Sequence, residues 1–263
     1  MKNKEWEPSN PDQWKYPKQP AQGNPRERRY WQWAISRDPD LSGTAKTLLH
    51  ALALRMKPDG EAARVRYEVL ARDLRCSQEL IRRVVPEVVS RGYLRLFWAR
   101  ENPSLATEWC PCFPGDSREQ AKDELLQLWF QAPTPRPPLK EDDPADWWEM
   151  QERSPKVRWY WERALRDRTN LPLRVRGLLW TIGLFSTGDG RVRRKMSVPF
   201  LAQRTGFSVD SVRRYLKVAI AARWLYSLEE TGGKNIIRYF LLTLRFPDGD
   251  PDFDGGEDNL DSD

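Results

Sequence analysis

The chain has 263 residues, of which 39% are hydrophobic and 31% are charged, and its formal net charge is +6. It contains no apolar run of about 18 residues, which excludes a membrane-spanning helix, and its first residues lack the apolar core of a secretory signal peptide. The sequence therefore predicts an intracellular protein.

The charge is distributed unevenly along the chain. Residues 1–27 carry a net charge of +1, residues 28–113 carry +5, residues 114–155 carry −5, residues 156–246 carry +13 and residues 247–263 carry −8. Two basic segments are thus separated by an acidic one and followed by an acidic tail. Basic segments of this kind favour a polyanionic partner, above all nucleic acid, although an inert basic surface is the alternative.

The segments outside the basic ones predict little folded structure. Residues 1–27 are Pro-rich and residues 247–263 are acidic and Gly-rich, so both are expected to be disordered. Residues 114–155 predict an acidic, partly helical linker, with a stiff spacer at Pro133 to Pro138. Its apolar residues predict a connector that docks on a domain, or else a partner-binding surface: Leu125, Leu126, Trp129, Phe130, Trp147 and Trp148.

The two basic segments align with each other, first at an offset of 130 residues and then, after a one-residue slip, at 131. The matches include Tyr30-Trp31 with Tyr160-Trp161, Leu48-Leu49 with Leu178-Leu179, Leu70-Ala71 with Leu201-Ala202, and Arg82-Arg83 with Arg213-Arg214. Matches in this order across about 70 residues indicate two copies of one domain, at residues 28–113 and 156–246.

Each copy predicts the same elements in the same order. A first helix carries the Tyr-Trp pair on one apolar face. A second helix follows from about Ser42 to Arg55, and from about Pro172 to Phe185 in the second copy. Asp-Gly turns then precede one short strand in each copy, at Arg64–Tyr67 and Arg191–Arg193.

The most informative stretch comes next, at residues 70–85 and 201–216. Each predicts a short helix, a tight turn and a second helix that begins at a serine N-cap, Ser77 or Ser208. The apolar positions of the second helix leave one face outward. That face carries Gln78, Glu79, Arg82 and Arg83 in the first copy and Val209, Asp210, Arg213 and Arg214 in the second.

Both copies resemble bacterial winged helix-turn-helix domains. The stretch from Leu41-Ser42 to Gly92-Tyr93-Leu94 is most similar to a type found in plasmid and phage replication initiators and in regulators of mobile elements. The resemblance implies a mainly α fold with small β-hairpin wings (α+β), organised as two tandem winged helix-turn-helix domains joined by a helical linker.

The β-hairpin wings are expected after each recognition helix. The first is predicted as a strand at 94–100 and a return at 105–113. The second is predicted as a strand at 225–228, a turn at 229–235 with Gly232-Gly233 at its tip, and a return at 236–242. Pro86 lies inside the first recognition helix and is predicted to kink or end it.

The expected function is sequence-specific binding of double-stranded DNA, with each recognition helix in the major groove. Arginine recognises guanine there, and further basic residues contact phosphate. The candidate DNA-binding residues are Ser77, Gln78, Arg82, Arg83, Arg193, Arg194, Lys195, Ser208, Val209, Arg213, Arg214, Lys217, Lys234 and Arg238. Two half-sites are expected about one turn of DNA, ~10 bp, apart or a multiple of it, and the long linker leaves their spacing open.

Catalysis is not expected. The chain has one histidine, His50, predicted to pack in an apolar helical face, and three cysteines, Cys76, Cys110 and Cys112. This set excludes a disulfide scaffold and a paired-histidine metal site, and no Ser-His-Asp or phosphate-loop motif occurs. We therefore expect no enzyme, no cofactor and no metal.

Three biological roles stay open. The resemblance favours a replication initiator of a plasmid, phage or integrative element over a transcriptional regulator, a repressor, of such an element. A protein–protein adaptor is the third, supported by Pro86 and the acidic linker. The expected partners are double-stranded DNA and replication or transcription proteins, with no membrane contact, and the chain is expected to act as a monomeric pseudo-dimer or a homodimer. The expected location is the bacterial cytoplasm, at the nucleoid or a plasmid.

Overall fold

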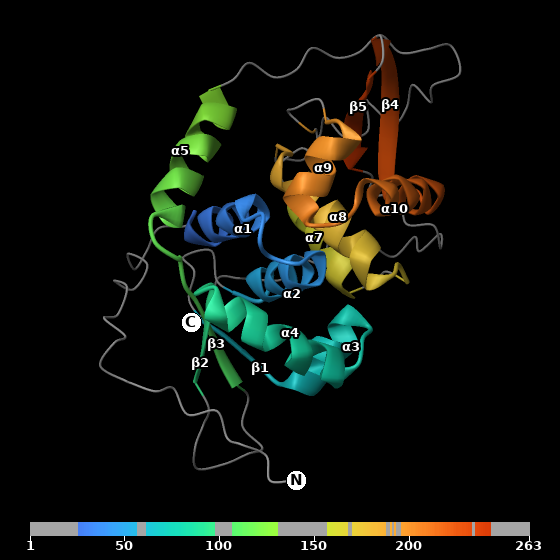
Figure 1. Cartoon of the computed structure of the whole chain (residues 1–263). Coiled ribbons are helices and arrows are strands. Elements are labelled where there is room, and N and C mark those ends of the chain that lie inside the picture. Colours follow the sequence, from blue (N-terminus) through green and yellow to red (C-terminus); the bar gives the residue numbers. More distant parts are fainter. Residues whose placement is uncertain are drawn as a thin grey trace, which may run out of the picture.

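The computed structural model describes residues 26–56, 62–97, 107–130, 157–167, 170–187, 190, 192, 196–232 and 235–242. These residues are mainly helical, with small antiparallel sheets (Figure 1). Within these ranges, no helix combines the length and apolar character needed to cross a membrane. The predicted disorder of residues 1–27 is wrong at its end, because Arg26 is the N-cap and Glu27 the first, buried residue of a helix, α1 (Glu27–Arg37). The predictions for residues 1–25 and 247–263, the spacer at 133–138, the turn at Asp59-Gly60 of the first copy and Trp147-Trp148 lie outside the described residues.

The first half of the chain folds as four helices and a small sheet. Its elements are α1 (Glu27–Arg37), α2 (Gly43–Ala53), β1 (Ala63–Val65), α3 (Tyr67–Leu74), α4 (Gln78–Ser90), β2 (Leu94–Phe97) and β3 (Thr107–Pro111). The strands are antiparallel in the order β1-β3-β2, so the middle strand is the last in sequence. Trp109 on β3 is fully buried and its indole donates a hydrogen bond to Val65 O at 2.8 Å, which ties the hairpin to β1.

The second half repeats this order. After the connecting helix α5 (Ser117–Phe130) come α7 (Val157–Asp167), α8 (Leu173–Leu184), α9 (Val198–Thr205), α10 (Val209–Ala221), β4 (Leu225–Gly232) and β5 (Asn235–Leu242). In the place that β1 holds in the first half, the second half has an isolated antiparallel bridge between Ser186 and Val192, and Val192 N–H also donates to Phe240 O of β5 at 3.2 Å. Over the described residues, the two halves therefore share one order of elements.

The hairpin of the second half is longer than predicted. Residues 229–232 were expected in a turn, but they continue β4, and Gly232 pairs with Asn235. The predicted turn at 229–235 is therefore wrong for residues 229–232, and Gly233 and Lys234 lie outside the described residues.

The predicted serine caps are confirmed. Ser77 Oγ accepts a hydrogen bond from Leu80 N at 3.1 Å, and Ser208 Oγ accepts one from Ser211 N at 3.3 Å. The helix before each cap ends in a left-handed residue, Arg75 with φ 48° and Gly206 with φ 70°. A Cβ at Gly206 would lie 2.7 Å from a backbone oxygen, so this turn requires glycine.

Pro86 was predicted to kink or end α4, and the predicted end is wrong, because the helix continues to Ser90. Proline in a helix interior costs about 3 kcal/mol through the missing N–H bond and a steric clash. Pro86 itself is exposed, whereas Val84, Val85 and Val88 are buried on the opposite face. Burying each valine contributes roughly 1.5–3 kcal/mol, so packing outweighs the cost of the proline.

One hydrophobic core extends through both halves. α2 and α8 lie against each other at its centre, α1 packs on α9, and α7 packs on α3 (Figure 1). The acidic connecting helix α5 packs along α1 through Ala121, Leu125 and Leu128, all buried. The predicted docking of this connector on a domain is therefore confirmed, although the side chains of Trp129 and Phe130 lie outside the described part.

Candidate nucleic-acid interface

The predicted recognition residues lie on the outer faces of α4 and α10. Arg82 and Arg83 on α4, and Arg213, Arg214 and Lys217 on α10, are all exposed. The opposite faces are buried, by Ile81, Val84, Val85 and Val88 on α4 and by Val212, Tyr215, Leu216 and Ala219 on α10. Helical periodicity alone thus fixes which face is free for a ligand.

Short-range contacts hold these arginines only weakly. Arg213 pairs with Asp210 at 2.9 Å, Arg82 donates to Gln78 Oε1 at 3.4 Å, and the Arg214 guanidinium lies 5.6 Å from the centre of the Tyr215 ring. Exposed pairs of this kind contribute about 0–1 kcal/mol. A phosphate or a guanine edge can therefore displace them at little cost.

The other predicted residues fall into two groups. Ser77 and Ser208 are engaged as N-caps, with the partly buried Gln78 and Val209 beside them in the first turn. Arg238 belongs to β5, and its side chain is not described. Arg193, Arg194, Lys195 and Lys234 lie outside the described residues, as does Arg191.

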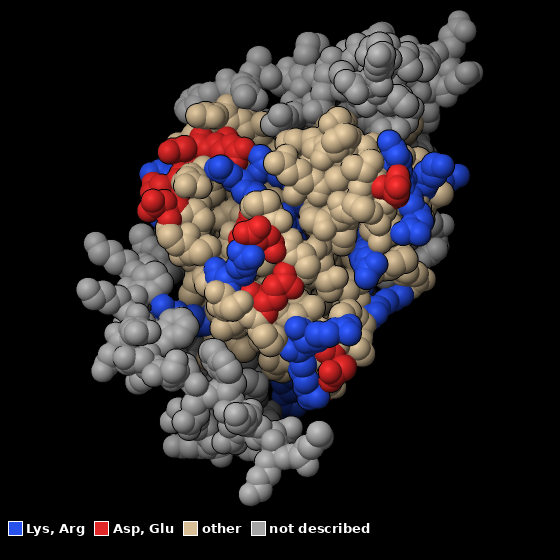
Figure 2. Space-filling view, viewed as in Figure 1, with Lys and Arg blue, Asp and Glu red and all other residues tan. Residues whose placement is uncertain are grey.

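Charge is separated across the visible surface. In Figure 2, Lys and Arg gather over α10 and along α3, whereas Asp and Glu gather over α5. The exposed cations in and beside α3 are Arg66, Arg72 and Arg75. On α4, Glu87 accepts hydrogen bonds from Ser42 N at 2.6 Å and from Ser42 Oγ at 2.8 Å, and Ser42 is the N-cap of α2. The basic surface accordingly follows the two helix pairs.

A groove of about 450 Å³ lies between the two helix pairs. It is lined by Thr44, Arg75, Cys76, Leu80, Pro172, Leu173, Arg174, Arg214 and Tyr215. Burial would raise the pKa of Tyr215, but hydrogen bonds with Arg174 and Ser211 lower it below its usual value. Leu80 in the first turn of α4 and Arg214 and Tyr215 in the middle of α10 lie in this lining, so α4 and α10 border the same groove.

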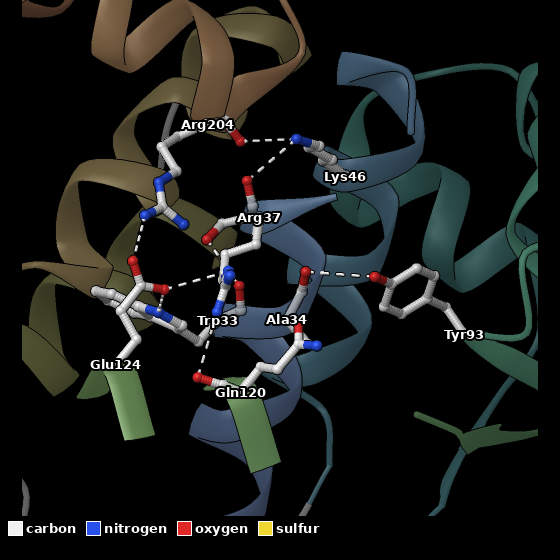
Figure 3. Close-up of polar contacts among 9 residues, drawn as sticks. Trp33, Ala34, Arg37, Lys46, Tyr93, Gln120, Glu124 and Arg204 are labelled. Atoms are coloured by element: carbon white, nitrogen blue, oxygen red, sulfur yellow. Dashed lines mark hydrogen bonds and ion pairs between the residues drawn. The ribbon is translucent and has the colours of Figure 1, made fainter. Parts of the chain in front are cut away.

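Buried cations at the contact between the halves were not predicted. Lys46 is 1% exposed, and its Nζ donates to Ser36 O at 3.2 Å and to Arg204 O at 3.0 Å, at the carboxyl end of α9 (Figure 3). Arg176 is fully buried and donates to Asp73 O at 2.6 Å and to Leu74 O, at the carboxyl end of α3. A cation is favourable at a helix carboxyl end.

Arg204 joins the connecting helix to both halves. Its guanidinium pairs with Glu124 of α5 at 2.6 Å, and Glu124 also accepts from the Trp33 indole at 2.7 Å and pairs with Arg37 at 3.3 Å (Figure 3). Burial would raise the pKa of Glu124, but the hydrogen bonds from Arg204 and Trp33 and the nearby arginines lower it. Glu124 is thus ionised and holds α5 against α1 and α9.

The described ranges contain no group of three or more His, Cys, Asp or Glu residues placed to hold a metal ion. Cys76, Cys110 and Cys112 are free thiols. Burial raises the pKa of all three cysteines, which disfavours the reactive thiolate.

No protein-family model, curated protein or solved structure matches the chain.

Proposed function

We propose that the chain is a tandem winged helix-turn-helix protein that binds double-stranded DNA in a sequence-specific manner through α4 and α10. One observation carries the proposal. The pairs α3–α4 and α9–α10 each turn through a left-handed residue, restart at a capping serine, expose two adjacent arginines at matching positions and lead into a hairpin. A helix presented in this way fits the major groove, and arginine there bonds guanine O6 and N7.

Affinity for duplex DNA is expected to fall steeply with salt, because each phosphate neutralised by an exposed Arg or Lys releases counterions. With roughly four to six such contacts, the logarithm of the association constant should fall with the logarithm of salt concentration with a slope of about −4 to −5. Fluorescence anisotropy of a labelled 30-bp duplex, at salt concentrations from about 50 to 300 mM, measures this slope. A slope near zero contradicts DNA binding.

The Arg213→Ala/Arg214→Ala double variant is expected to lose sequence preference, whereas Lys234→Ala is not. Each bidentate arginine–guanine contact discriminates by about 1–3 kcal/mol, so the ratio of specific to random affinity should fall at least tenfold. Lys122→Ala on α5 removes a charge remote from α10 and is the control. An equal loss on specific and random duplexes would show that the two arginines contact phosphate instead.

For the biological role, we propose a replication initiator first and a transcriptional regulator second, because the resemblance to winged helix-turn-helix proteins favours the initiator. A footprint across the DNA that flanks the gene separates the two. Protection of a repeated array beside an AT-rich stretch supports the initiator, and one short protected site over a promoter supports the regulator. The absence of any protected site would favour the protein–protein adaptor.

A further inference from the structure

The two halves contact each other through matching residues. Lys46 on α2 holds the carboxyl end of α9, and Arg176, its counterpart 130 residues later on α8, holds the carboxyl end of α3. The contact of α1 with α9 is likewise matched by that of α7 with α3. Lys46 contacts Arg204, and the counterparts of these two residues, Arg176 and Asp73, contact each other in the same way. Such reciprocal contacts indicate that the two halves are related by a two-fold axis.

The position of this axis follows from one further contact. Gly177 on α8 packs against Thr47 on α2, and these two residues are each other's counterparts at the offset of 130. A residue that touches its own counterpart lies on the two-fold axis. The axis therefore passes between α2 and α8, the centre of the common core.

The contact at the axis is closely packed. A Cβ at Gly177 would overlap Thr47 Oγ1, and a Cβ at Gly43 would overlap the ring of Phe207. Leu48, Leu49, Leu178 and Leu179 around it are at most 3% exposed. The core, rather than the linker, sets how the halves are placed, so the spacing that the sequence leaves open is fixed by the fold.

We propose that one chain recognises an imperfect inverted repeat at a single spacing. This rests on the proposed DNA binding. The backbone of B-DNA has local two-fold axes, so two recognition helices related by a two-fold axis contact half-sites in opposite orientations when both bind one duplex. The matching arginine pairs predict the same guanines in both half-sites.

One position predicts where the two half-sites differ. Gln78 in the first turn of α4 corresponds to Val209 in the first turn of α10. Glutamine bonds adenine through N6 and N7, whereas an apolar side chain contacts the thymine methyl group. The half-site bound by α4 should therefore carry adenine where the other carries thymine on the equivalent strand.

In vitro selection of the purified full chain on a random duplex library tests the proposal. We expect inverted half-sites at one spacing, and one chain per duplex by native mass spectrometry. Direct repeats, several spacings, a single half-site or two chains per duplex would overturn it. Enrichment of no sequence at all would instead be a failure of the proposed DNA binding, and the two failures are thus distinguishable.

Two variants sharpen the test. Gln78→Val introduces at α4 the residue that α10 carries at the matching position. It should replace adenine with thymine in one half-site and make the repeat more symmetric. Unchanged base preference contradicts the assignment of Gln78. Gly177→Leu separates the halves at the axis. Circular dichroism first establishes that the variant is folded. The affinity of each protein is then measured for the optimal duplex and for a duplex whose half-sites are moved by 2 bp. The factor by which this move weakens binding should be at least fivefold smaller for the variant than for the unaltered chain. An equal loss for both chains would contradict the role of the axis.

Discussion

Replacing Arg176 with alanine is expected to destabilise the protein by about 2–6 kcal/mol, because two backbone carbonyls lose their donor and each buried acceptor left without a partner costs about 1–3 kcal/mol. Burial lowers the pKa of Arg176 to about 10, so the side chain stays charged at neutral pH. Its loss leaves the carbonyls of Asp73 and Leu74, at the end of α3, buried without this donor. Urea unfolding followed by circular dichroism measures the change in the free energy of unfolding.

The control for this prediction is Arg174→Ala, two residues earlier on α8. Arg174 is exposed, so its replacement should change the free energy of unfolding by no more than about 0.5 kcal/mol. Lys46→Ala repeats the test on the other side of the axis and should destabilise in the same sense, because carbonyls of Ser36 and Arg204 lose their donor. If Arg176→Ala were as stable as Arg174→Ala, the buried contact would not hold the halves together.

Acid is expected to destabilise the protein through His50. Burial, and then the charge of Lys46, lowers the pKa of His50 in the folded protein to about 3. Because the unfolded chain binds this proton near pH 6.5, stability is complete above pH 6.5 and falls as the pH decreases towards 3. The slope is about 1.4 kcal/mol per pH unit, so roughly 3 kcal/mol is lost by pH 4.5 and about 5 kcal/mol by pH 3.

His50→Leu isolates this contribution from that of the carboxylates. Neither ring nitrogen of His50 has a hydrogen-bond partner among the described residues, so the leucine variant should be at least as stable at pH 7. Unfolding measured at pH 7 and at pH 4.5 should show a smaller acid loss in the variant, by about 3 kcal/mol. Parallel losses in both proteins would mean that His50 does not titrate in this window.

Local features of the fold were predictable because short-range chemistry determines them. The serine caps at Ser77 and Ser208, the left-handed Gly206 and the buried stripe of α10 each follow from a few neighbouring residues. Pro86 shows the limit of that approach. A local rule predicts a break, and the packing of distant apolar residues against α4 overrides it.

The contact between the halves was not predictable in the same way. Lys46 and Arg176 stand at matching positions within mainly apolar helices, which is a detectable signal, but each has partners in the other half of the chain. Sequence spacing does not show that a cation will meet the carboxyl end of a helix more than 100 residues away. The exposed arginines of α4 and α10 were predictable as a surface, and their ligand stays a proposal.

The shared core also determines how the chain responds to its own abundance. A protein that must dimerise before it binds fills its site in proportion to the square of its concentration when it is scarce. Here both recognition helices are held in one folded unit, so under the proposed function no association step precedes binding. If one chain fills one site, as proposed, occupancy rises linearly with protein concentration when the protein is scarce, without a threshold.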